Sequence, residues 1–253
     1  MKRTRIIFAL ALAGLFATPS RAADSINARL EAGQLGNIQA GKYSAGDSVT
    51  FTLTSWNEKF LLQIDGDPET YVLSSDQASL GGRVLKYDSG AMAIHVSGWG
   101  GMTLYTDDNP AGLPAVRIGD IAPVKSAPLK LNDLKKAAND EATHLDYVCG
   151  VKLNFAINWD RLAAMPALWP TAFQAIENTG RGIERFAASR HAMMAMHRVG
   201  AVRIETGPGP ALALSGRTIV VTYNTDNGVM GLASSRAIAR ALAVALSVPR
   251  AGE

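Results

Sequence analysis

The densest group of reactive side chains in the sequence lies between residues 140 and 149. Asp140 and His144 are four residues apart, so a helix would place them on one face. A carboxylate beside an imidazole can bind a metal or transfer protons, and His144 with Cys149 could supply a base and a thiol nucleophile. The alternative is a solvent-facing helix surface that carries one histidine, and no second motif in the sequence selects the catalytic interpretation.

A second unusual group combines methionine with histidine between residues 191 and 197. Thioether and imidazole groups are ligands that suit Cu(I). At about 100° per residue, Met193, Met196 and His197 would share one face of a helix. The spacing differs from the i, i+4 histidine pair of helical zinc sites. Methionines that fill a core, with histidines at its edge, are the alternative. These three residues are therefore candidate metal ligands, and no cofactor is predicted.

Both groups belong to residues 131–253, where the hydrophobic period is mainly helical. A helix is expected over 131–148, ended by Gly150, and a strand with alternating apolar residues follows. We expect Gly180-Arg181-Gly182 to break a second helix before a third one over 183–199. Short strands at 202–205, 211–214 and 218–223 and a helix capped by Ser234 or Ser235 complete this region. The pattern predicts an α+β half with a short antiparallel sheet and several helices.

Residues 49–118 instead follow the two-residue period of strands. Val49, Phe51 and Leu53 alternate with threonines, and about seven short apolar runs are separated by turn signals. This pattern predicts an N-terminal antiparallel β-sandwich or small barrel. Residues 119–130 contain two prolines and are expected to be a linker. Residues 23–48 have little periodicity and are expected to be a poorly ordered lead-in.

The first 22 residues have the composition of a secretory signal peptide. Lys2, Arg3 and Arg5 precede an apolar run over 6–17, and small residues follow up to Ala22, after which we expect cleavage. Removal of this segment takes away four basic residues and leaves 21 basic against 22 acidic residues, a net charge of −1. We therefore expect a periplasmic or secreted protein that does not bind nucleic acid and has no transmembrane segment in its mature chain. The one cysteine, Cys149, can form no internal disulfide.

Four stretches of the chain together resemble a known family. They are FLLQIDGDPETYVL (60–73), GMTLYTDDNPAGLPA (101–115), VRIETGPGPALALSGRTIVVTY (202–223) and SSRAIARAL (234–242). In this order they are similar to an uncharacterised family of exported bacterial proteins, a domain of unknown function. The resemblance covers roughly residues 56–247 and implies that both halves form one unit. It implies no activity, cofactor or catalytic residue.

The sequence leads us to expect an exported, non-enzymatic binding or envelope-associated module. Its partner would be an envelope protein, a glycan or a lipid, and strand edges or aromatic residues of the β-rich half would provide the binding surface. A periplasmic hydrolase with a site near His144 is one alternative. A copper-binding protein that uses the segment from Met193 to His197 is the other.

Overall fold

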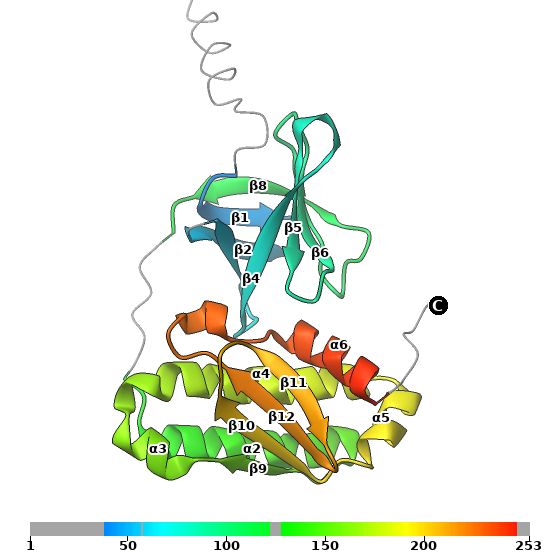
Figure 1. Ribbon diagram of the computed structural model, residues 1–253. Coiled ribbons are helices and arrows are strands. Elements are labelled where there is room, and N and C mark those ends of the chain that lie inside the picture. Colours follow the sequence, from blue (N-terminus) through cyan, green and yellow to red (C-terminus); the bar gives the residue numbers. More distant parts are fainter. Residues whose placement is uncertain (1–37, 57, 122–127, 247–253) are drawn as a thin grey trace, which may run out of the picture. The chain divides into compact units, whose positions relative to one another are not determined.

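The computed structural model describes residues 38–56, 58–121 and 128–246. The expected signal peptide, the first part of the expected lead-in and residues 122–127 of the expected linker lie outside the described residues. The fold class is confirmed, because an antiparallel barrel is followed by helices and a small sheet (Figure 1).

The N-terminal half is a closed barrel in which every strand pairs antiparallel with its neighbours. Pairing of the first strand with the last closes it, from Ala45 opposite Ala115 to Lys42 opposite Gly119. The strands are β1 (Gly41–Ala45), β2 (Val49–Trp56), β3 (Lys59–Ile64), β4 (Thr70–Gln77), β5 (Arg83–Tyr87), β6 (Met92–Val96), β7 (Met102–Leu104) and β8 (Leu113–Gly119), with a 3-10 turn η1 (Ser79–Gly81) after β4. Strand β1 lies within the expected lead-in. The sequence did not predict this strand, because five residues that include Gly41 give only a weak alternating signal.

Side chains fill the interior of the barrel. Phe51 and Leu53 on β2 are completely buried, whereas Thr52 and Thr54 between them are not. The same alternation places Leu62, Leu73, Leu85, Ile94 and Leu104 of the following strands inside, each without exposed surface. An eight-stranded barrel is just wide enough for side chains to fill it. Closure also removes free strand edges from this half, so the binding edges expected there are absent among its described strands.

The C-terminal half places helices against a four-stranded sheet (Figure 1). Its elements are α2 (Leu131–Cys149), β9 (Asn154–Ile157), α3 (Trp159–Ala164), a 3-10 turn η2 (Pro166–Leu168), α4 (Trp169–Ala187), α5 (Arg190–Met196), β10 (Ala201–Thr206), β11 (Ala211–Ser215), β12 (Thr218–Tyr223), a 3-10 turn η3 (Gly228–Gly231) and α6 (Ser235–Ala245). As expected, Gly150 ends α2 with a left-handed backbone (φ 63°). Leu134, Leu145, Ile176, Ile183 and Leu242 are buried in the core between helices and sheet.

The sheet of this half is mixed rather than antiparallel. Its order is β11-β12-β10-β9, and β10 runs parallel to both of its neighbours. The loop Gly207–Pro210 does not join adjacent strands, because it carries the chain past one strand position and β12 then returns into the gap. The turn at Ser215-Gly216 makes a hairpin between β11 and β12. Loop length alone therefore did not distinguish adjacent strands from strands one position apart.

Helix α4 continues through Gly180-Arg181-Gly182, although the sequence predicts a helix break at these residues. Both glycines lie where other groups approach closely. A Cβ atom on Gly180 would overlap the Glu141 carboxylate of α2, and one on Gly182 would lie 2.5 Å from Ile238 of α6. The glycines thus allow two helices to pack closely against α4, and this contact outweighs their poor helix propensity. The helix expected over 183–199 is instead divided, because Ser189 caps the separate helix α5.

The segment Gly228–Ala245 has the length and mean hydropathy (1.2) of a membrane-spanning helix. In the structure it consists of η3 and α6 rather than one continuous helix. Helix α6 has 11 residues, which rise about 16 Å, against a bilayer core of about 30 Å. Ile238 and Leu242 are buried in the protein core. We therefore interpret this segment as part of the core.

Candidate functional site

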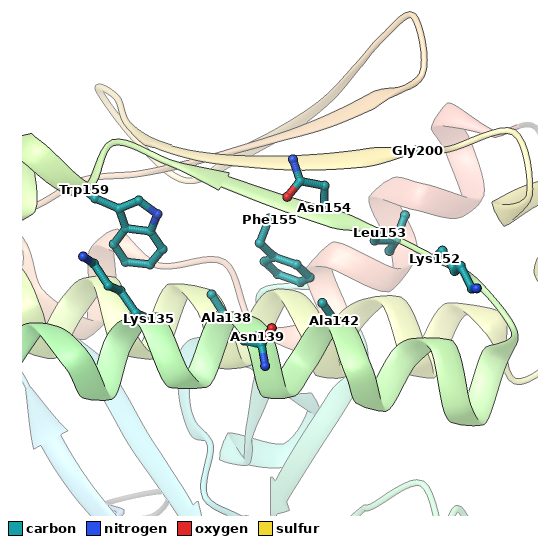
Figure 2. A pocket seen from close by; sticks show the side chains of 10 residues that line it. All are labelled: Lys135, Ala138, Asn139, Ala142, Lys152, Leu153, Asn154, Phe155, Trp159 and Gly200. Carbon is teal, nitrogen blue, oxygen red and sulfur yellow. The ribbon is translucent and has the colours of Figure 1, made fainter.

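A groove open to solvent runs between helix α2 and strand β9 (Figure 2). Its volume is about 620 Å³. Ala138 and Ala142 of α2 and Leu153 and Phe155 around β9 give it an apolar floor. The polar lining residues are Lys135, Asn139, Lys152, Asn154 and Trp159. In Figure 2, Lys135 and Trp159 lie at one end and Lys152 at the other, while the ring of Phe155 points toward α2.

Strand β9 contributes an unpaired backbone edge to this groove. It is the last strand in the sheet order and pairs only with β10. The N–H of Asn154 donates to the carbonyl of Gly200, at the start of β10, over 3.3 Å. Because successive residues in a strand direct their backbone groups to opposite edges, the N–H and C=O of Phe155 are directed to the free edge. An extended chain could pair there.

The charged residues that line the groove are both basic. The ammonium group of Lys135 lies 5.9 Å from the centre of the Trp159 ring, a cation–π distance. Lys152 is strongly exposed, and its ammonium group is 4.0 Å from the Asp146 carboxylate, at the limit of an ion pair. An ion pair that is so exposed to solvent adds little to the stability of the fold. Both lysines are therefore free to meet an acidic partner.

Asp140 and His144 both lie on α2, but each has a different partner. Nε2 of His144 is 3.2 Å from a carboxylate oxygen of Glu184, on α4. Asp140 forms an ion pair with Lys136, one turn earlier on its own helix. The His144 and Glu184 side chains are each nearly half exposed. The imidazole thus has a carboxylate partner, but a different one from that expected.

Cys149, the third candidate of this group, is buried at the end of α2. Burial raises the pKa of its thiol, and the nearby carboxylate of Glu184 acts in the same direction. A raised pKa lowers the thiolate fraction, and the thiolate is the reactive form of cysteine. No hydrogen bond joins Cys149 to His144 in the described part of the chain. This environment is that of a structural cysteine.

The methionine–histidine candidates occupy different environments. Met196 has no exposed surface and packs in the core, whereas His197 is exposed at the end of α5 and Met193 is half-buried. Among residues 38–56, 58–121 and 128–246, no group of three or more His, Cys, Asp or Glu side chains is arranged to hold a metal. Packing accounts for Met196.

Glu141 has the environment of a functional carboxylate. It belongs to the reactive group between residues 140 and 149 but is not one of the three candidates taken from that group. Burial, followed by the charge of Glu177, raises its pKa to about 7, and Arg181 and His144 act in the opposite direction. Its spacing from His144 gave a partial signal, but Glu177 and Arg181 belong to α4, so only the tertiary fold brings the cluster together. Glu141 is not among the residues that line the groove between α2 and β9.

Carboxylates at one end of the barrel bind the N-terminus of α6 within one compact unit. Glu69 accepts hydrogen bonds from the N–H of Ser235 over 2.7 Å and from its hydroxyl over 2.6 Å. Asp88 accepts one from the N–H of Ser234 over 2.8 Å and a second from its hydroxyl. Helix N-termini favour negative charge, so both contacts stabilise α6. Sequence reasoning correctly predicted serine caps here but not the carboxylates that bind them.

A polar cavity of about 410 Å³ lies beside this contact. Most of the charges that line it are already paired. Asp107 binds both Arg185 and Arg236, and Asp65 binds Lys42 over 3.0 Å. The Arg236 guanidinium also lies 4.1 Å from the centre of the Tyr87 ring. We therefore interpret this lining as the ionic contact that joins the barrel to α4 and α6, not as the binding site.

Together, the closed barrel and the helix-covered mixed sheet define an α+β protein that carries a basic surface groove beside strand β9. The chain belongs to the DUF4908 family, a domain of unknown function whose model matches residues 25–242. The match confirms the resemblance to a domain of unknown function that the sequence indicated. No curated protein and no solved structure matches the chain.

Proposed function

We propose that this protein is a non-enzymatic binding module that captures an extended, acidic segment of a partner protein along strand β9. One observation carries the proposal: the free edge of β9 opens into a groove whose charged lining residues are both lysines. Main-chain hydrogen bonds to a sheet edge give affinity, and flanking side chains select the sequence. In this proposal the strand edge that binds a partner belongs to the α+β half, whereas the sequence led us to expect it in the barrel.

The groove sets the length and charge of the segment. Strand β9 has four residues, which span about 13 Å when extended. Acidic side chains of the partner would meet Lys135 near one end and Lys152 near the other, and an aromatic or aliphatic residue would pack on Trp159. Charge complementarity of this kind raises the association rate and sets the register of the bound strand.

We also propose that the protein acts outside the cytoplasm, after cleavage following Ala22. The support is the basic, then apolar, then small-residue order of residues 1–22. Intact mass spectrometry of the protein recovered from its own host tests this. A chain that begins at Ala23 is the expected result, and a full-length chain that begins at Met1 would contradict export by this signal.

Selection from a library of random short peptides, displayed on phage and panned on the purified chain, tests the groove. We expect enrichment of extended peptides rich in Asp and Glu, with the largest amide NMR shifts around Phe155. The variant Lys135→Glu, Lys152→Glu should bind these peptides at least about tenfold more weakly, because each contact to a charged group contributes about 1.5–3 kcal/mol. The matched control is Lys59→Glu, an exposed lysine on β3. Enriched peptides that bind the double variant as tightly as the unchanged chain would contradict the proposal.

A further inference from the structure

A second cavity, separate from the groove, lies where the parallel strands of the C-terminal sheet end. It has a volume of about 230 Å³ and is lined by Ile157 at the end of β9, Glu205 and Thr206 at the end of β10, and Tyr223 at the end of β12. In open α/β sheets, ligands bind outside the carboxyl ends of the parallel strands. The position is therefore that of a small-molecule site, and it shares no lining residue with the groove of Figure 2.

The remaining lining residues come from the segment after β9. Leu162 and Leu168, with Ile157, form an apolar wall, and Arg161 places a guanidinium group at the same cavity. Leu162 is buried and Arg161 is exposed, so the cavity has an apolar interior and a charged mouth. Sites for drug-sized ligands begin at about 300 Å³, so this cavity fits a smaller molecule.

Of the charged groups that line the cavity, the Arg161 guanidinium is the one that an anionic ligand would neutralise. Glu205 is already paired, since its carboxylate is 3.1 Å from Nε of Arg203. Arg161 has no carboxylate within ion-pair distance in the part of the chain that the structure describes. Its charge acts on the Tyr223 hydroxyl, where it opposes the burial that raises the pKa of that group. Arg161 and Tyr223 line the same cavity, so the guanidinium and the phenol can both donate to one ligand there.

We propose that this cavity binds a small organic carboxylate with a short apolar chain. The carboxylate accepts hydrogen bonds from the Arg161 guanidinium and the Tyr223 hydroxyl, and the chain packs against Ile157, Leu162 and Leu168. A planar guanidinium is suited to bidentate contact with a carboxylate. This site goes beyond the proposed function, because it needs neither the β9 edge nor the groove lysines.

Isothermal titration of the full chain with acetate, propionate and butyrate tests the site. Affinity should rise with chain length, roughly fourfold for each added methylene group. The variant Arg161→Gln should weaken butyrate binding at least about tenfold, since it removes a charged hydrogen-bond donor. Tyr223→Phe should weaken it by a smaller factor. The matched control is Arg190→Gln, which replaces an exposed arginine at the start of α5 that does not line the cavity and should leave butyrate binding unchanged. In the Lys135→Glu, Lys152→Glu variant butyrate should still bind, so that failure of the groove and failure of this site are distinguishable.

Several outcomes would overturn the assignment. Butylamine that binds as tightly as butyrate would show that Arg161 does not select an anion. Phosphate that binds as tightly as butyrate would reveal an anion contact only, with no role for the apolar wall. Unchanged butyrate affinity in the Arg161→Gln variant, whose fold is checked by circular dichroism, would remove the site altogether.

Discussion

The carboxylate of Glu69, between β3 and β4 of the barrel, is fully engaged by Ser235, the first residue of α6. It accepts from the Ser235 backbone N–H at 2.7 Å and from the hydroxyl at 2.6 Å, and it lies 3.7 Å from Nε of Arg181 on α4. Only 1% of the Glu69 surface is exposed. Burial raises its pKa, while the bonds from Ser235 and the charge of Arg181 lower it. The barrel therefore supplies a buried anion to the positive end of a helix in the other half.

Replacing Glu69 by alanine should destabilise the protein strongly. The change leaves the N–H of Ser235 buried without its acceptor and removes one carboxylate from Arg181. Arg181 keeps its ion pair with Glu177 at 3.1 Å, so its charge is not left alone. We expect the free energy of unfolding, measured by urea titration, to fall by about 2–4 kcal/mol.

The control for this change is Asp76→Ala. Asp76 is paired with Lys86 over 2.7 Å, but both side chains are about half exposed. Exposed pairs contribute at most about 1 kcal/mol, so the control should change the unfolding free energy little. Equal losses in the two variants would mean that the contact between Glu69 and Ser235 has no special role in stability.

The sequence predicted what depends on local periodicity. Alternation of Phe51 and Leu53 with threonines predicted a strand with one buried face, and Gly150 marked the end of α2. It did not predict the partner of Glu69, because 166 residues separate Glu69 from Ser235 and the Gly66-Asp67-Pro68 turn beside Glu69 indicates only a hairpin. Nor did it predict that Gly180 and Gly182 lie within a helix, since close packing of other helices overrides propensity.

In the candidate site, too, local sequence patterns did not predict which residues far apart in the chain come together. A spacing of four predicted that Asp140 and His144 share a face of α2, but His144 is paired with Glu184, forty residues away on a packed helix. The binding groove depends on β9 being an edge strand, which follows from the strand order and not from the four residues of the strand. Lys135 and Lys152 had no distinguishing local pattern.

Glu141 predicts a pH dependence of stability. Its pKa rises from an ordinary value of 4.5 to about 7 in the folded protein, so the native state binds this proton more tightly than the unfolded chain does. Its contribution to stability is thus complete below pH 4.5 and is lost as the pH rises through 7. We expect Glu141→Gln to flatten the fall in stability over this window. At pH 8 the variant should be more stable by about 1–2 kcal/mol, a value reduced because Glu141 is only half-buried.

Chemical unfolding at a series of pH values between 4 and 8 measures this effect. The matched control is Glu58→Gln, which neutralises an exposed carboxylate of the barrel. Its unfolding free energy should follow that of the unchanged protein across the range. A Glu141→Gln variant that is less stable at pH 8 than at pH 4 by the same amount as the unchanged protein would assign the pH dependence to other groups.

The effect of Gly180→Ala on stability should change sign when the Glu141 side chain is removed. A Cβ atom on Gly180 would collide with the Glu141 carboxylate, so Gly180→Ala alone should destabilise the protein by about 1–3 kcal/mol. When Glu141 is also alanine, the collision is gone and only the better helix propensity remains. In that background Gly180→Ala should stabilise by about 0.5–1 kcal/mol. A double-mutant cycle by urea unfolding measures the coupling, and additive effects would place the two groups apart in solution.

Met196 should behave as a core residue and not as a metal ligand. It has no exposed surface, so Met196→Ala should cost about 2–5 kcal/mol of unfolding free energy. Met194, on the same helix but 63% exposed, should change stability by no more than about 0.5 kcal/mol when it is replaced by alanine. Met196→Leu keeps the volume of the side chain and should cost less than about 1.5 kcal/mol. Because Met196 is buried in the core, Met193 and His197 lack the third ligand of the expected set, and a Met193→Leu, His197→Gln variant should bind Cu(I) as tightly as the unchanged protein. Tighter Cu(I) binding by the unchanged chain, at equal stability, would restore the copper interpretation of this helix.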